Sequence, residues 1–326
     1  MWLTIWTRSD KDRAIDPMKP PAWPATAVFL CLLMGWSGAD APARPVTLTK
    51  AAEEAARRDI ARDRDETQKW LRTDPTSYLA TIHRRDFEQR KTLSLGRAAD
   101  NEVRIDDPTV SAHHLRVTVD GDRFRVEAVD AGARFGVGDE LKREAQLEPS
   151  NIKVGRFVVR LSHQRFPAII VFDPTSPRFK EYTGLRYFPI DLTYRFEVPL
   201  TPPARSETMI IMSTRGSRRR AERVGWFEFM VGETPGRLEA VRLLEPGVGE
   251  NDISIFFRDE TTGKETYSLG RYVDVKKLPD GKYLLDFNFA YNPACAFSDH
   301  YNCPIPPKAN TLKVPIKAGE MDSRYH

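Results

Sequence analysis

The chain has 326 residues, 40% of them hydrophobic and 29% charged, a composition typical of a soluble globular protein with one or two domains. Its 50 basic and 46 acidic residues leave a net charge of only +4. A nucleic-acid-binding protein needs a concentrated basic surface, so this balance argues against that class. The densest basic run, RGSRRRAER at residues 215–223, stands between two strand-like segments and is predicted to form a solvated hairpin loop.

Residues 1–41 are predicted to be a targeting segment, with translation starting at Met18. Lys19 provides a positive charge, residues 25–36 form an apolar run, and Ala39-Asp40-Ala41 matches a signal-peptidase site. The apolar run is too short for a comfortable bilayer span. We therefore expect export to the periplasm or the extracellular space, a mature chain that begins near Pro42, and no membrane span after cleavage. An uncleaved N-terminal anchor is the alternative.

Residues 42–75 are predicted to contain one charged helix. The segment is rich in Ala, Glu and Arg, which favour helix, and its acidic and basic residues alternate at helical spacings. Ala52, Ala56 and Ile60 share one helical face, so we expect the helix to pack through them on the protein surface. Asp74-Pro75 is predicted to end it.

The rest of the chain is predicted to be mainly β, with residues 76–172 and 173–326 forming two units. In the second unit, short alternating segments such as TYRFEVPLT and VGWFEFMVG are joined by Gly-rich turns without intervening helices. Tyr194, Phe196, Val198 and Leu200 fall on one face of the first of these segments. This pattern predicts an antiparallel meander, closed as a barrel or folded as a sandwich, followed by a Pro-rich C-terminal tail.

The first unit contains SLGRAADNEVRIDDPTVSAHHLRVTVDGDRFRVEA, residues 94–128. This segment is similar to the forkhead-associated domain, a β-sandwich whose loops bind phosphothreonine peptides. The motif residues are Gly96-Arg97, Ser111 and His114. The resemblance implies that Arg97 and Ser111 bind the phosphate, which suits the bidentate geometry of a guanidinium, and that His114 braces the loop.

One departure from that family concerns the Asn-Gly pair that holds the peptide backbone. It would fall in DAGARFGVG, where Phe135 precedes Gly136. Without the amide we expect a degenerate phosphopeptide site, and hence the sandwich fold without affinity for phosphothreonine. His113 and His114 are predicted to be loop and core residues, because no third ligand stands at a metal-like spacing. No metal is predicted.

From about Trp70 to Glu320 the chain resembles the bacterial domain-of-unknown-function 1684 (DUF1684) family. The segments that carry this resemblance are TGLRYFPIDLTYRF, FRDETTGKETYSLGRYVDV, LLDFNFAYNPACAF and NCPIPPKANTLKVPIKAGE. The resemblance implies no established activity.

A candidate polar pocket is predicted around KYLLDFNFAYNP. Strand alternation places Tyr283, Leu285, Phe287 and Phe289 on a core face and Leu284, Asp286, Asn288 and Ala290 on the other, with Asp286 and Asn288 about 7 Å apart. These two side chains lie either on a wetted outer face or in a pocket. By the same parity Glu265 and Tyr267 share a face of the neighbouring strand. The candidate pocket residues are Glu265, Tyr267, Asp286, Asn288, Tyr291 and Asn292.

Two functions are compatible with these residues. No nucleophile motif, zinc-protease motif or phosphate-binding loop is present, and no cofactor is expected. The first hypothesis is a non-catalytic binding or accessory protein whose partner is a polar small molecule or a protein. The alternative is a hydrolase that uses Glu265 and Asp286 as a carboxylate pair.

Cys295 and Cys303 are the two cysteines of the predicted mature chain. An even pair in an oxidising compartment predicts a disulfide that closes the loop CAFSDHYNC. A metal site is the rival, because His300 gives a Cys-x4-His-x2-Cys arrangement, although a fourth ligand is not evident. Two free thiols are expected if the chain stays in the cytosol.

Overall fold

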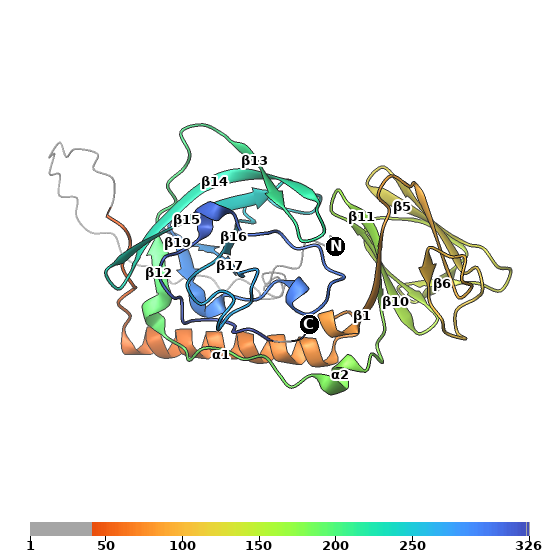
Figure 1. The fold of residues 1–326 in the computed structure, drawn as a ribbon, viewed down its shortest axis with the longest axis horizontal. Helices are drawn as coiled ribbons and strands as arrows, with labels where there is room; N and C mark the ends of the chain where they lie inside the picture. Colours follow the sequence, from red (N-terminus) through yellow and green to blue (C-terminus); the bar gives the residue numbers. More distant parts are fainter. Residues whose placement is uncertain (1–40, 324, 326) are drawn as a thin grey trace, which may run out of the picture.

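The computed structural model describes residues 41–323 and 325, so the predicted targeting segment lies outside the described residues except for Ala41. The fold is mainly β, as predicted, and consists of two β-rich units with one long helix, α1, running along the second unit (Figure 1). Within the described part of the chain, none of the helices has the length and apolar character needed to cross a membrane.

Helix α1 (Lys50–Thr73) confirms the predicted charged helix. It begins after Thr49, whose hydroxyl accepts a hydrogen bond from the backbone N–H of Ala52, and it ends at Asp74, before the proline. Ala56 and Ile60 are buried, but Ala52 is exposed. The buried face therefore begins one turn later than predicted, because nothing packs over the first turn.

The first unit is a β-sandwich, as predicted. One sheet has the order β1-β11-β10-β9-β6-β7 and the other β3-β2-β4-β5-β8, and buried side chains from both sheets form a single core. Its strands are β1 (Thr81–Asp86), β2 (Thr92–Gly96), β3 (Val103–Arg104), β4 (Leu115–Asp120), β5 (Arg123–Ala128), β6 (Phe135–Val137), β7 (Glu140–Lys142), β8 (Glu144–Leu147), β9 (Ser150–Val154), β10 (Phe157–His163) and β11 (Pro167–Phe172).

The second unit settles the choice between a barrel and a sandwich. It has a sheet of order β13-β14-β15-β16-β17 and a smaller sheet of order β12-β19-β18, and they do not close into a barrel. Its strands are β12 (Arg195–Val198), β13 (Thr208–Met212), β14 (Arg218–Val231), β15 (Thr234–Leu243), β16 (Ser254–Phe257), β17 (Arg271–Asp274), β18 (Lys276–Lys277) and β19 (Tyr283–Asp286).

Short helical turns connect these sheets and interrupt the otherwise irregular C-terminal tail. They are η2 (Tyr78–Ala80), α2 (Arg178–Glu181), η3 (Leu192–Tyr194), η4 (Phe287–Phe289), η5 (Ala294–Ala296) and η6 (Lys308–Asn310).

The core of the second unit confirms the face predicted for β12. Phe196 and Val198 are fully buried, and Tyr194 and Leu200 pack against the same cluster. The chain joins this unit early, since the N–H of Ala43 donates to the carbonyl of Glu228 at 3.0 Å.

The predicted alternation of KYLLDFNFA is wrong beyond Asp286. Strand β19 ends there, and the next three residues form η4, because the Asp286 carboxylate accepts the N–H of Asn288 and so caps the turn. Phe287 and Ala290 are buried, whereas Phe289 is only half-buried. The period-2 rule fails where a side chain competes with the strand for backbone N–H groups.

The basic run at residues 215–223 was predicted to be a solvated hairpin loop, but only residues 215–217 lie in the hairpin turn and residues 218–223 already belong to β14. In this turn between β13 and β14, the N–H of Ser213 bonds to the carbonyl of Ser217 at 2.9 Å. Arg219 is buried, with 3% of its side chain exposed. The hairpin turn lies against the first unit (Figure 1), where Arg215 pairs with Asp86.

Candidate functional site

A cavity of about 140 Å³ lies between the two units. Arg84 of β1 and Arg160 and Ser162 of β10 line it from the first unit. The second unit contributes Arg219 of β14 and, from the C-terminal tail, residues that include Tyr301. Because segments distant in sequence supply its walls, the cavity exists only when the two units are docked.

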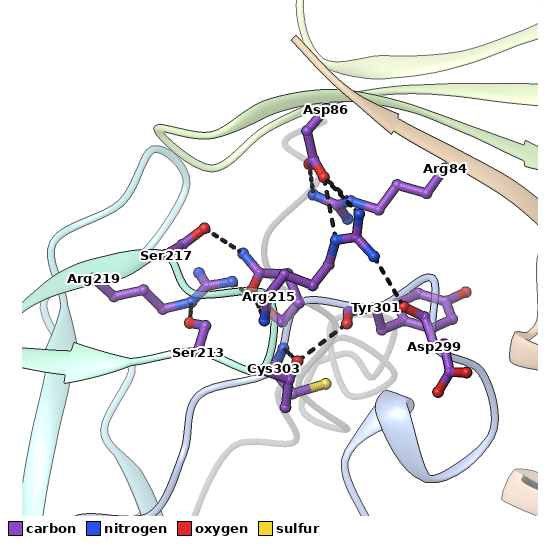
Figure 2. A network of polar contacts seen from close by, with 11 residues as sticks. Arg84, Asp86, Ser213, Arg215, Ser217, Arg219, Asp299, Tyr301 and Cys303 are labelled. Atoms are coloured by element: carbon purple, nitrogen blue, oxygen red, sulfur yellow. Dashed lines mark hydrogen bonds and ion pairs between the residues drawn. The ribbon is translucent and has the colours of Figure 1, made fainter. Parts of the chain in front are cut away.

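A polar network holds the units together beside this cavity (Figure 2). Asp86 accepts hydrogen bonds from Arg84 of its own strand at 2.9 and 2.7 Å. It also pairs with Arg215 of the opposite hairpin at 3.2 Å. The hydroxyls of Thr81 and Tyr301 share a 2.6 Å hydrogen bond across the same boundary. These contacts are charge-assisted or buried, so they fix the relative position of the two units.

Arg219 forms a buried ion pair with Glu245 on the second unit's side of the cavity. Its other nitrogens donate to the Ser213 hydroxyl at 2.7 Å and to the carbonyl of Asn302 at 2.6 Å. Burial raises the pKa of Glu245 against the opposing effect of Arg219. The positive charge of Arg219 is therefore largely compensated by Glu245 within the protein.

Tyrosine side chains supply much of the aromatic surface of the cavity. Burial raises the pKa of Tyr78, Tyr272 and Tyr301, so their hydroxyls stay protonated at neutral pH. The hydroxyl of Tyr272 donates to the carbonyl of Pro304. These rings form an apolar wall with polar edges, which is the usual character of a small-molecule site.

Arg160 differs from the other two cavity arginines because no carboxylate of the described residues pairs with it. Its guanidinium stacks on the ring of Phe172, 4.6 Å from the centroid, and its Nε donates to the amide oxygen of Asn151 at 3.1 Å. Among the described residues, its buried Nη2 has no hydrogen-bond partner. Burial lowers the pKa of Arg160. An unsatisfied buried N–H of this kind is uncommon, and it marks a position where an acceptor is favoured.

Asp286 and Asn288 brace a loop and lie outside the walls of the cavity. Asp286 is buried and ion-paired with Arg195 at 2.6 Å. Asn288 donates to Asp286 at 2.8 Å, and its amide oxygen accepts the N–H of Asp191 at 3.0 Å. The distance of 7 Å expected between these side chains is wrong, because η4 turns Asn288 back onto Asp286.

Glu265 and Tyr267 do not lie on a strand, because residues 261–266 form a turn and β17 begins only at Arg271. Glu265 pairs with Lys317 at 3.3 Å, with both side chains partly exposed. Asp286 is paired with Arg195 instead, so a different cation holds each carboxylate and the arrangement gives the predicted carboxylate pair no support. The Tyr267 hydroxyl donates to the carbonyl of Cys295 at 3.2 Å.

The last two candidate pocket residues differ in position. Asn292 is buried, and its side chain donates to the carbonyl of Met321 at 2.8 Å, which holds the C-terminal segment. Tyr291 lines the cavity, as do its near neighbours Pro293 and Ala294. The segment KYLLDFNFAYNP therefore borders the cavity through Tyr291 rather than through the carboxylate of Asp286 or the amides of Asn288 and Asn292.

Cys295 and Cys303 are both buried and carry free thiols. The N–H of Cys295 donates to Sγ of Cys303 at 3.2 Å. A hydrogen bond from Cys303 lowers the pKa of Cys295, whereas burial raises that of Cys303. The described residues contain no group of three or more His, Cys, Asp or Glu side chains positioned to hold a metal ion.

The motif residues of the first unit form a braced loop. Gly96 packs against the carbonyl of Ala112, and the N–H of Arg97 bonds to the carbonyl of Ser111 at 2.9 Å. His114 accepts the N–H of Ser111 at Nδ1 (3.0 Å), so its Nε2 carries the proton that it donates to the carbonyl of Arg134 at 2.8 Å.

The side chain of Arg97 is exposed and makes no hydrogen bond or ion pair within the described residues. Phe135 is fully buried in the sandwich core. Phe135 is the residue predicted to stand where the forkhead-associated family has its asparagine, and here its side chain packs in the core.

Two family profiles match the chain. Residues 93–151 match the forkhead-associated domain, and residues 180–321 match DUF1684, a protein family of unknown function. The DUF1684 match covers less than half of the chain and a shorter span than the predicted Trp70–Glu320, so DUF1684 describes the C-terminal unit. The forkhead-associated match lies within the sandwich, so the N-terminal half carries a forkhead-associated-like unit. No curated protein matches the chain.

Several solved structures are similar to parts of it. An uncharacterized protein of Haloarcula marismortui, from gene locus rrnAC0354, is 33% identical over 47% of this chain and 85% of that one, with a TM-score of 0.38. The forkhead-associated domain of FhaA, solved with the intracellular domain of Rv3910, is 22% identical over 24% of this chain and 78% of its own, with a TM-score of 0.19. A domain from a study of phosphothreonine-dependent forkhead-associated interactions is 24% identical over 25% and 75% of the two chains, with a TM-score of 0.20.

The role of the cavity arginines was not predicted from the sequence. The three arginines belong to three different strands. Arg84 and Arg160 stand in no local motif, and Arg219 lies in the basic run that was predicted to be a solvated loop. The one available signal was Arg160 within FVVRLSH, where an arginine occupies the outward face of a strongly apolar strand. That signal indicates a covered outer face, but not what covers it.

Proposed function

We propose that this protein is an exported, non-catalytic binding protein that takes a small polar ligand into the cavity between its two units. The observation that carries the proposal is the cavity itself, where Arg160 presents a buried, unpartnered N–H beside tyrosine rings. Convergent polar groups in a largely apolar hollow are the usual features of a ligand site. The separate ion pairs of Glu265 and Asp286 give no comparable basis for hydrolysis.

The docked arrangement also supports a role in which a ligand stabilises the contact between the units. The cavity walls come from both units, so a bound ligand contacts both of them. A ligand that binds only the docked form shifts the equilibrium towards it by mass action. The forkhead-associated-like unit then serves as a packing partner of the DUF1684 unit, and a protein partner can recognise the docked pair.

Export is part of the same proposal. It is supported by the signal-like sequence between Met18 and Ala41 and by the hydrogen bonds that tie the chain into the fold from Ala43 onward. N-terminal sequencing of periplasmic or secreted protein should give a mature chain that begins near Pro42. Recovery of intact cytosolic chain starting at Met1 would contradict it.

A disulfide between Cys295 and Cys303 is proposed for the exported protein. The two cysteines are not at disulfide distance in this structure, and the proposal is supported by the 3.2 Å contact between the N–H of Cys295 and Sγ of Cys303, which shows that the two residues are neighbours. Closing this loop should stabilise the fold by roughly 2–3 kcal/mol in the chain-entropy model. Mass spectrometry of non-reduced protein should show a linked peptide pair, whereas two freely alkylated cysteines would refute the bond.

The binding role can be tested by a ligand-observed NMR screen of small polar fragments. Ser162 faces the cavity from β10, so Ser162→Trp should fill it and abolish binding of the hits. Arg116→Trp is the matched control, since Arg116 is exposed on β4 of the other sheet and should leave binding unchanged. Hits that survive Ser162→Trp, or the absence of any hit, would refute the proposed function.

A further inference from the structure

The charges around the cavity are unevenly compensated. Arg84 is paired with Asp86, and Arg219 is paired with Glu245. Asp252 also lines the cavity, and its carboxylate accepts the N–H of Gly249 at 2.7 Å. Arg160 remains as the one lining arginine without an ion pair to a described residue. Its guanidinium is held in place by Phe172 and Asn151, so it is already oriented for an acceptor.

The size of the cavity limits the ligand. Its volume of about 140 Å³ is well below the roughly 300–1,000 Å³ typical of sites for drug-sized molecules. The small volume favours a ligand of a few heavy atoms over a nucleotide or a peptide segment. Guanidinium groups bind planar or tetrahedral oxyanions through two parallel hydrogen bonds, whereas a cation would be repelled by Arg160.

We infer that the cavity binds a small oxyanion, of the phosphate or carboxylate type, through the Nη2 of Arg160. This inference rests on the proposed function and specifies the chemical class of its ligand. Asp252 also lines the cavity, so its negative charge should weaken the binding of an anion there. The two oxyanions share the same recognition chemistry, so they have to be distinguished by experiment.

The test is thermal unfolding of the full mature protein with inorganic phosphate or succinate, at an ionic strength held constant with sodium chloride. An anion that binds the folded state should raise Tm by roughly 3 °C at about ten times its Kd. Arg160→Gln should weaken binding about tenfold or more, since a hydrogen bond to a charged group is lost. Arg116→Gln is the control and should bind like the original protein.

Asp252→Asn provides a second variant in case Arg160→Gln does not fold, and it should strengthen anion binding by removing a repelling charge. If only one of the two anions raises Tm, that anion shows whether the ligand is of the phosphate or the carboxylate type. A shift that persists in Arg160→Gln and is unchanged in Asp252→Asn overturns the inference. If neither anion raises Tm more than sodium chloride does, the inference fails. The proposed function still stands in that case if neutral fragments bind the original protein and their binding is lost in Ser162→Trp. If nothing binds in the cavity, both fail.

Discussion

Replacing Asp259 with asparagine should strongly destabilise the DUF1684 unit. Asp259 and Arg271 form an ion pair at 3.1 Å, with 0% and 1% of their side chains exposed. Arg271 also donates to the carbonyls of Ile316 (2.8 Å) and Ala318, so it connects β17 to the C-terminal segment. The Asp259 carboxylate further accepts the N–H of Ile316 at 2.7 Å.

The magnitude follows from the burial of the pair. Removing one partner of a buried ion pair leaves the other charge without compensation and costs about 3–5 kcal/mol. Burial already lowers the pKa of Arg271, which shows that its charge is poorly solvated when Asp259 is the main compensating group. Glu265 and Lys317 form a pair 42% and 55% exposed, so Glu265→Gln should cost only about 0–1 kcal/mol.

The assay is equilibrium urea unfolding, followed by the fluorescence of Trp226, which lies in β14 of the same unit. Asp259→Asn should lower the unfolding midpoint far more than the control Glu265→Gln does. A loss of less than about 1 kcal/mol in Asp259→Asn, or equal losses in the two variants, would refute the argument from burial.

Three further predictions concern the first unit and its boundary with the second. Burial lowers the pKa of His83 and of His300 from 6.5, and their rings lie 6.3 Å apart at the boundary. The unfolded chain therefore binds more protons below that pH, so stability should be full above about pH 6.5 and fall as the pH is lowered below it. Urea unfolding midpoints measured at several pH values should show this loss of stability. The double variant His83→Gln, His300→Gln should reduce the pH dependence of the midpoint, and an unchanged pH dependence would mean that these two histidines do not cause it. Gly96→Ala places a Cβ 2.2 Å from the carbonyl oxygen of Ala112, so urea unfolding should show a loss of about 1–3 kcal/mol, and no loss would mean that the loop adjusts. A phosphothreonine peptide library should yield no binder that depends on Arg97, and a binder lost in Arg97→Ala would show a working phosphopeptide site.

The candidate site was only partly predictable. The sequence directed attention to the segment that includes Tyr291, which does line the cavity. The neighbouring Asp286 and Asn288 were assigned to a strand face, but they cap a turn and brace the loop at Asp191. Local periodicity cannot reveal this, because a capping carboxylate and a strand-face carboxylate have the same sequence pattern.

The sequence by itself determined the mainly β class, the N-terminal helix, the forkhead-associated-like sandwich and the resemblance of the C-terminal unit to DUF1684. These properties depend on local alternation, turn residues and motif strings, all of which are readable along the chain. Only the tertiary structure decided that the second unit stays open as two sheets and that Arg160 faces Tyr301 across a cavity. The physical reason is that the burial of an outward-facing strand residue depends on which distant surface docks against it, and no local pattern records that choice.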